Sequence, residues 1–262
     1  MEVVREQTEE TKVALPKNFE SKKKVSICML TMERYVMTKY VFETLISFVG
    51  EDIDVELLVL DNASKDTRIV DYFKDIADVH IVESENIGVA KGFNKLFRKC
   101  TGDYICLIGN DIVVHKNWLN DLIYYADLID NSGICAIFCE GIRGYFTPLM
   151  SVNDTLVNIW KRNDNTIDGL QLFRKEILEK IGGYDETFGK YGYEDNQFAL
   201  RCAYSGYHNF YIPNQFSTHI GRDINETSNY RKEKDLALQI SQLRFVETLR
   251  EMKKSKNYFI SL

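Results

Sequence analysis

Polar side chains that could bind a cation or a charged ligand recur at the ends of apolar segments in this 262-residue sequence. One pair of such residues follows each of four successive apolar segments: Thr31 and Glu33, Asp61 and Asn62, Asn86 and Gly88, and Asn110 and Asp111. Asp and Asn are also common turn formers, so one such position by itself is weak evidence. Four in succession favour a shared site, in which carboxylate and amide oxygens could coordinate a hard cation.

The elements that could position these residues alternate along the first half of the chain. Short apolar runs suited to buried strands occupy 25–30, 55–60, 79–82, 104–108 and 133–138. Helical spacing of apolar residues occurs in 36–49, 66–77, 90–100 and 118–129. The alternation predicts an α/β fold with a mostly parallel, Rossmann-like central sheet and helices on both faces. Ligands of such sheets bind beyond the carboxyl ends of the strands, where the polar residues fall.

The second half of the sequence is less regular. Residues 141–167 are rich in polar and aromatic side chains without a clear period, which predicts a long binding loop. A strand is expected at 170–173 and short helices at 175–181 and 195–204. The clearest helix spans 229–254, with an apolar stripe formed by Leu236, Ile240, Leu243, Val246 and Leu249.

The net charge of −6 is unevenly distributed. Residues 1–24 contribute +1 and residues 229–256 contribute +4, so the remaining residues carry −11. This acidic body argues against nucleic acid as a partner, because a phosphate backbone requires a positive surface. A phosphorylated ligand would need another source of positive charge, and a divalent cation held by carboxylates is the usual one.

Several common motifs are absent from the sequence. It has neither the GxGxxG pattern of dinucleotide-binding folds nor the GxxxxGK[ST] pattern of phosphate loops. Its six cysteines include no CxxC pair, so we expect buried thiols in a reducing compartment. The longest apolar runs are far shorter than the roughly 20 residues that span a bilayer. We therefore expect a cytoplasmic protein.

Several short motifs occur in a characteristic order. They are 61–64 with Asp66, 86–88 with Asn94, 102–104 leading into 108–111, then 181–186, 191–195 and His219. Each motif is weak evidence alone. Together and in this order, they give the sequence a resemblance to the family-2 glycosyltransferases, which have the GT-A fold. The resemblance covers about three quarters of the chain, from residue 25 to residue 221. It implies a transferase that uses a nucleotide-diphosphate sugar.

The resemblance implies a role for each motif. Asp111 and His219 match the metal ligands of the family, and an imidazole ligand favours Mn²⁺ over Mg²⁺. Asp195 matches the general base that takes the proton of the acceptor hydroxyl, and Glu194 matches the residue that orients the acceptor. The implied nucleotide-binding residues are Thr31, Glu33, Asp61, Asn62, Asn86, Gly88, Asn110 and Arg222.

The family pattern has one departure and leaves alternatives open. Gly109 stands where Asp or Asn is typical, so Asp111 is the last carboxylate of that motif. The implied activity is an inverting transfer of hexosyltransferase type, with a UDP-sugar as favoured donor. Gly109 suggests a second reading, a nucleotide-sugar-binding module with impaired catalysis. A retaining GT-A transferase would not require Glu194 and Asp195, and Asp195 could also cap its helix.

Three segments follow from this organisation. Residues 1–24 are expected to form a polar N-terminal arm, 25–228 a GT-A catalytic domain, and 229–262 a C-terminal amphipathic helix and tail. Residues 221–230 resemble the loop that closes over the donor. The basic helix could pack on the catalytic domain, form a homodimer or contact an anionic membrane peripherally. The implied acceptor is a glycan, a lipid-linked group or a protein.

Overall fold

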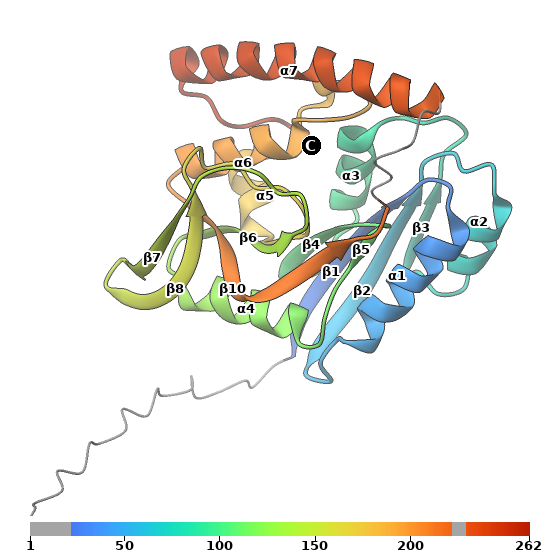
Figure 1. The fold of residues 1–262 in the computed structure, drawn as a ribbon, viewed down its shortest axis with the longest axis horizontal. Helices are drawn as coiled ribbons and strands as arrows, with labels where there is room; N and C mark the ends of the chain where they lie inside the picture. The colour runs from blue at the N-terminus through green and yellow to red at the C-terminus, as the bar shows by residue number, and fades with distance from the viewer. Residues whose placement is uncertain (1–21, 222–228) are drawn as a thin grey trace, which may run out of the picture.

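The computed structural model describes residues 22–221 and 229–262, which form a central sheet with helices on both sides (Figure 1). The first half contains strands β1 (Lys23–Thr31), β2 (Ile53–Asp61), β3 (Val79–Val82), β4 (Tyr104–Gly109) and β6 (Ser132–Cys139). The helices between them are α1 (Tyr35–Ser47), α2 (Thr67–Phe73), α3 (Val89–Phe97) and α4 (Trp118–Leu128). The predicted α/β alternation is confirmed.

The strands pair in the order β3-β2-β1-β4-β9-β6-β10-β8-β7. Strands β1 to β4 are parallel, whereas β9 (Gln171–Arg174) runs antiparallel between β4 and β6. The short strand β5 (Ile112–Val113) pairs with β10 (His208–His219) outside this path. The order reverses at β1, which has β2 on one side and β4 on the other. The carboxyl ends of these strands therefore form the crevice where a ligand is expected.

The sheet has a hydrophobic core on each face, because successive side chains of a strand point to opposite sides. Along β1, Ile27 and Met29 belong to the core under α1, α2 and α4. Cys28 belongs to the opposite core, under α3, α5 (Glu176–Ile181) and α6 (Glu194–Tyr204). Coverage of both faces explains why the strands read as continuous apolar runs instead of alternating ones.

The structure corrects the prediction for residues 141–167. Strands β7 (Phe146–Val152) and β8 (Thr155–Arg162) form an antiparallel hairpin that extends the sheet beyond β10 (Figure 1). Trp160 of β8 pairs with Tyr211 of β10 and packs against the second core. The sequence pattern does not predict β10, because Pro213 and a register shift between Ile212 and Phe216 interrupt its apolar period.

Helix α7 (Asn229–Ser255) lies across α6 and the short helix η1 (Glu186–Phe188), at the top of Figure 1. The predicted apolar stripe is not the packed face, since Leu236, Ile240 and Leu243 are 59%, 59% and 71% exposed. Ser241 and Met252 are buried instead. The surface beneath α7 presents backbone carbonyl groups, and a hydroxyl side chain satisfies these better than an apolar stripe would.

One predicted boundary moves. Strand β1 begins at Lys23, so Lys24 belongs to the sheet and contacts Glu56 at 3.4 Å instead of lying in an N-terminal arm. Residues 1–21 of that arm, and residues 222–228 with Arg222, lie outside the described residues. In the part that is described, no helix is long and apolar enough to cross a membrane. The six cysteines are buried and free of disulfides.

Asn94 of α3 fixes the segment that leads into α6. Its Nδ2 donates to the carbonyl oxygen of Tyr184 at 2.9 Å and to Oε1 of Glu186 at 3.0 Å. Its Oδ1 accepts from the backbone N–H of Tyr184 at 2.8 Å. Asn94 and Tyr184 are each 1% exposed, so these bonds replace water completely.

We predict that Asn94→Leu lowers the free energy of unfolding by about 2–4 kcal/mol, because it leaves the buried N–H and C=O groups of Tyr184 without partners. Urea denaturation measures the change. The matched variant Asn163→Leu alters an exposed asparagine and should change stability by less than about 0.5 kcal/mol. Equal stability of the two variants would contradict the assigned role of Asn94.

Candidate active site

Thr31 and Asp61 lie side by side at the carboxyl ends of β1 and β2, where they pair in register. Oγ1 of Thr31 donates to Oδ2 of Asp61 at 3.2 Å, and the Asp61 carboxylate also accepts from the backbone N–H and the hydroxyl of Ser64 at 2.8 and 2.5 Å. Both side chains are fully buried. They therefore shape the loop after β2 instead of presenting free polar groups to solvent.

Glu33 locks the loop after β1 to the loop after β2. Its carboxylate accepts from the backbone N–H groups of Lys65 at 2.9 Å and Asp66 at 3.3 Å. Its own N–H donates to Oγ of Ser64 at 2.7 Å, and its backbone has a positive φ of 57°. The two loops therefore form one hydrogen-bonded unit at the edge of the sheet.

Asn62, Asn86 and Gly88 connect this unit to the loop after β3. Nδ2 of Asn62 donates to Oδ1 of Asn86 at 3.0 Å, and the same Oδ1 accepts from the N–H of Gly88 at 2.9 Å. Gly88 has φ of 87°, and a Cβ there would lie 2.6 Å from the carbonyl oxygen of Gly189. Only glycine allows this close approach, which brings residues 189–190 to the start of α3.

Asp111 and His219 are brought together by the pairing of β5 with β10, in which His219 lies opposite Ile112. Nε2 of His219 is 3.1 Å from Oδ2 of Asp111. Two ligands at right angles around a divalent cation, each about 2.1 Å from it, are about 3 Å apart. The carboxylate and the imidazole thus fit a pair of Mn²⁺ or Mg²⁺ ligands. The described residues contain no group of three or more His, Cys, Asp or Glu that could hold a metal.

The neighbours of Asp111 explain the glycine that departs from the family pattern. A Cβ at Gly109 would lie 2.9 Å from Oδ1 of Asp111, and one at Gly221 would lie 2.5 Å from its Oδ2. Both glycines leave space for the carboxylate. Asn110, between Gly109 and Asp111, turns toward α1, where its Nδ2 donates to Oγ1 of Thr38 at 2.9 Å. Its side chain is therefore engaged away from Asp111.

Positive charge surrounds Asp111. Burial raises the pKa of this carboxyl, but the hydrogen bond and charge of His219, with the charges of Lys234 and Arg34, outweigh burial and lower it. Arg34 follows β1, and its Nη1 donates to the carbonyl oxygen of Gly221 at 2.9 Å. Asp111 is therefore ionised and available as a cation ligand at neutral pH.

Glu194 and Asp195 begin helix α6, whose N-cap position is Tyr193 with φ of 67°. Asp195 lies in the first turn and is not the cap, so the capping alternative is wrong. Oδ1 of Asp195 accepts from the backbone N–H of Asn196 at 2.7 Å and from its Nδ2 at 3.0 Å. Among the described residues, Oδ2 of Asp195 has no hydrogen-bond partner.

Asn196 and Asp168 support Asp195 and were not predicted from the sequence. Nδ2 of Asn196 donates to Oδ1 of Asp168 at 2.7 Å, and Asp168 also pairs with Arg162 of β8. The backbone N–H of Asp168 donates to the hydroxyl of Tyr211 at 2.9 Å. These contacts depend on the β7–β8 hairpin and on β10, which the sequence pattern does not predict. No local signal identifies the residues.

The acidic pair is strongly desolvated. Burial raises the pKa of Glu194 to about 7, against smaller opposing effects of the backbone N–H groups of Glu194 and Gly192 and of the Lys234 charge. Burial, with the charges of Glu194 and Asp168, raises the pKa of Asp195 well above its ordinary value. Asp195 retains partial solvent exposure, although protein atoms surround it densely.

The hydroxyl of Tyr191 is affected both by the Glu194–Asp195 pair and by Asp111. Burial raises the pKa of its hydroxyl, and the charges of Glu194, Asp195 and Asp111 raise it further. Asp111 is distant in sequence from the adjacent Glu194 and Asp195, yet the charges of all three carboxylates raise the pKa of this one hydroxyl. The charge of Asp111 therefore reaches the side chain of Tyr191, which lies three residues before Glu194.

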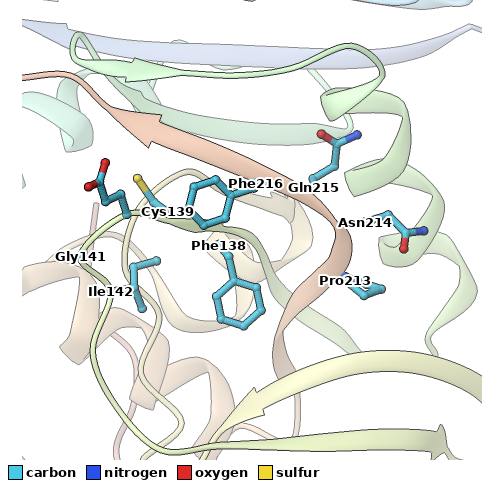
Figure 2. Close-up of a pocket in the computed structure, with 9 residues that line it drawn as sticks. Phe138, Cys139, Gly141, Ile142, Pro213, Asn214, Gln215 and Phe216 are labelled. Carbon is cyan, nitrogen blue, oxygen red and sulfur yellow. The ribbon is translucent and has the colours of Figure 1, made fainter.

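An open cavity of about 560 Å³ lies beside the end of β6, at the register shift of β10 (Figure 2). Its lining includes Phe138, Glu140 and Phe216. The ring of Phe138 stacks on Tyr211 at 4.6 Å, and Tyr211 contacts Asp168. None of the predicted site residues in the described part of the chain lines this cavity.

Comparison with protein families gives the class of this protein. Residues 26–182, more than half of the chain, match glycosyl transferase family 2. Residues 152–225 match the N-terminal domain of galactosyltransferase. The chain therefore belongs to glycosyl transferase family 2, as the ordered motifs predict.

Two curated relatives are distant. The chain is 24% identical over 179 residues to the glucosyl-dolichyl phosphate glucuronosyltransferase of Haloferax volcanii, covering 64% of this chain and 57% of that protein. It is 22% identical over 155 residues to the poly(ribitol-phosphate) beta-N-acetylglucosaminyltransferase TarS of Staphylococcus aureus, covering 55% and 27%. The chain thus spans about half, or less, of the length of these relatives.

Solved structures share the GT-A fold. GalNAc-T7 with UDP, GalNAc and Mn²⁺ has a TM-score of 0.69 at 14% identity, covering 87% of this chain and 48% of that one. PcManGT of Pyrobaculum calidifontis with GDP-Man and Mn²⁺ has a TM-score of 0.59 at 18% identity, covering 79% and 59%. TarS 1–349 of S. aureus with UDP-GlcNAc has a TM-score of 0.57 at 15% identity, covering 80% and 64%.

We predict that Glu194→Gln makes the protein more stable than the wild type at pH 8 but not at pH 4. The folded-state pKa of Glu194, about 7, lies above its ordinary value of 4.5, so the folded state holds the proton more tightly. The wild type therefore loses stability as the pH rises from about 4.5 to about 7, by up to about 3 kcal/mol, whereas glutamine cannot ionise.

Urea denaturation across this pH range measures the difference between the two proteins. Glu179→Gln, which changes an exposed glutamate of α5, serves as the control and should follow the wild-type curve. If the Glu194→Gln and wild-type curves remain parallel throughout, Glu194 is not a desolvated acid.

Proposed function

We propose that this protein is an inverting glycosyltransferase that moves a sugar from a nucleotide-diphosphate donor to an acceptor hydroxyl. One observation carries the proposal: Nε2 of His219 lies 3.1 Å from Oδ2 of Asp111, where the β5–β10 pairing brings two potential ligands of one divalent cation together. A direct displacement needs a diphosphate site and a base for the acceptor. In our proposal the Asp111–His219 pair serves the first and the Glu194–Asp195 pair the second.

The loops after β1 and β2 are proposed to hold the nucleoside. Thr31, Glu33 and Asp61 would act by fixing the shape of these loops, because their side chains are already hydrogen-bonded within them. A preformed loop binds a ligand without losing conformational entropy. A UDP-sugar is the favoured donor, since GalNAc-T7 and TarS were solved with UDP or UDP-GlcNAc, although PcManGT was solved with GDP-Man.

The remaining donor contacts are proposed at the neighbouring strand ends. Asn62, Asn86 and Gly88 would line the nucleoside site as one hydrogen-bonded group. Asn110 would contribute through its backbone, because its side chain is bonded to α1. Arg222, which lies outside the described residues, is proposed as a ligand of the donor phosphates.

Asp111 and His219 would hold a Mn²⁺ or Mg²⁺ ion. When bound, such an ion stabilises negative charge on the leaving diphosphate as a Lewis acid. Nitrogen coordination by His219 favours Mn²⁺, and Mn²⁺ is present in the solved structures of GalNAc-T7 and PcManGT. The space that Gly109 leaves beside Asp111 supports Asp111 as a sole carboxylate ligand.

Asp195 would act as the general base. Its unpartnered Oδ2 would take the proton of the acceptor hydroxyl while the hydroxyl oxygen attacks the anomeric carbon. The bond between that carbon and the diphosphate oxygen breaks at the same time, so the nucleoside diphosphate leaves and the configuration inverts. A raised pKa makes the carboxylate a stronger base. Glu194 would orient the acceptor.

The acceptor is proposed to be a glycan, a lipid-linked group or a protein. The names of the relatives, a glucosyl-dolichyl phosphate glucuronosyltransferase and a poly(ribitol-phosphate) transferase, support a large or lipid-linked acceptor. Two other activities stay open: a binding module with impaired catalysis and a retaining transfer. Turnover separates the first from our proposal, and the configuration of the product separates the second.

We predict that Asp195→Asn lowers the transfer rate by about 10²–10⁴-fold, because the amide cannot accept the proton. Binding of the donor, measured by calorimetry, should stay near that of the wild type. The control Asp130→Asn, at an exposed position after α4, should retain full turnover. Wild-type turnover in Asp195→Asn would remove Asp195 from the mechanism, and a retained anomeric configuration in an NMR assay would exclude direct displacement.

We predict that EDTA abolishes transfer and that Mn²⁺ restores it. In a thermal-shift screen of UDP-, GDP- and dTDP-sugars, the matching donor with Mn²⁺ should raise Tm by about 5 °C, because it binds only the folded state. Asp111→Asn and His219→Gln should lose the Mn²⁺-dependent part of this shift. His115→Gln, at an exposed histidine, should keep it. Full activity under chelation would contradict the metal site.

A further inference from the structure

Helix α7 packs on the segment that carries the acidic pair. Oγ of Ser241 lies 2.7 Å from the carbonyl oxygen of Phe188 and 2.9 Å from that of Tyr191. The ring of Phe245 stacks on Tyr193, which precedes Glu194, with the centroids 5.1 Å apart. These contacts fix the middle of α7 over the segment that leads into the Glu194–Asp195 pair.

Lys234 lies on this packed face of α7 and is half-buried. Its Nζ is 4.1 Å from the ring centroid of Tyr191, the side chain on which all three site carboxylates act. The Lys234 charge in turn acts on both Asp111 and Glu194. The charge of the ammonium group therefore acts both on Asp111, which pairs with His219, and on Glu194 of the Glu194–Asp195 pair.

Among the residues that the structure describes, Lys234 has no carboxylate partner of its own. Within residues 22–221 and 229–262, no ion pair below 4.0 Å involves it, whereas Arg244 on the same helix contacts Asp185, Glu247 and Glu251. A half-buried ammonium held over an aromatic ring gives up hydration without gaining a counter-ion. Such a cation beside a crevice is suited to an anionic ligand.

The charge balance of the site calls for this cation. Residues outside the segments 1–24 and 229–256 carry a net charge of −11. The carboxylate of Asp111 would also neutralise part of the charge of a bound metal ion. The diphosphate of a sugar nucleotide is anionic, and it gains negative charge when the bond to the sugar breaks. Preorganised cations that meet developing charge lower the barrier most effectively.

We propose that Lys234 of α7 binds the diphosphate of the donor and stabilises the leaving nucleoside diphosphate. This assignment rests on the proposed function. It makes α7 part of the donor site, although the helix lies outside the residues that match glycosyl transferase family 2. An ammonium group supplies three donors and a compact charge, which suits phosphate oxygens.

The test compares Lys234→Met with the wild type by calorimetry, using UDP, GDP and uridine as probes in the presence of Mn²⁺. Methionine keeps most of the side-chain length and removes the charge. The Kd of the nucleoside diphosphate that the wild type binds should rise about 10-fold, as expected for one charge-assisted hydrogen bond. The Kd of uridine should not change, because uridine has no phosphate.

Two further variants separate charge from structure. Lys234→Arg keeps the charge and should recover most of the affinity for the diphosphate. Lys232→Met removes a charge from an exposed position of the same helix and should bind like the wild type. The Tm of each unliganded variant shows whether α7 remains docked.

The outcomes distinguish the two proposals. If the wild type binds UDP or GDP and Lys234→Met binds it equally well, the Lys234 assignment is overturned and the proposed function stands. A parallel loss of affinity for uridine would give Lys234 a structural role and would also overturn the assignment. If the wild type binds neither nucleoside diphosphate, both proposals fail.

Discussion

The cost of holding Glu194 and Asp195 together in a desolvated setting is the constraint on which the rest of the site depends. Two adjacent carboxylates repel each other and lose hydration, so burial raises the pKa of both. The N-terminus of α6, the amide of Asn196 and the charge of Lys234 offset part of this cost. The site thus retains a carboxylate that is a stronger base than an exposed one.

Such a pair is useful only if its position is fixed, and three sets of contacts fix it. Gly88 admits the backbone of residues 189–190 to the start of α3. The side-chain amide of Asn94 donates to the carbonyl oxygen of Tyr184 and accepts from its N–H, and Ser241 of α7 contacts the carbonyl oxygens of Phe188 and Tyr191. The segment before α6 is therefore clamped between two helices, which limits the entropy lost when a ligand binds.

The arrangement of Asp111 and His219, the proposed metal ligands, depends on sheet pairing in the same way. Asp111 follows β4, whereas His219 ends β10, and the β5–β10 pairing brings their side chains to 3.1 Å. The order reversal at β1 places the loops after β1 and β2 at the adjoining edge. The two halves of the fold each contribute one part of the candidate site, so its residues come together only when the whole sheet has formed.

The α/β alternation and the strand ends that carry Asp61 and Asp111 could be predicted from the sequence alone, because apolar period and turn chemistry are local properties. The Glu194–Asp195 pair is predicted only from the resemblance to the family. That β7, β8 and β10 extend the sheet became clear only from the folded chain, since these strands carry polar and interrupted patterns. The folded chain also shows that the apolar stripe of α7 faces outward and that Lys234 faces Tyr191. Which face of a helix packs depends on the surface it meets, and a one-dimensional pattern does not contain that surface.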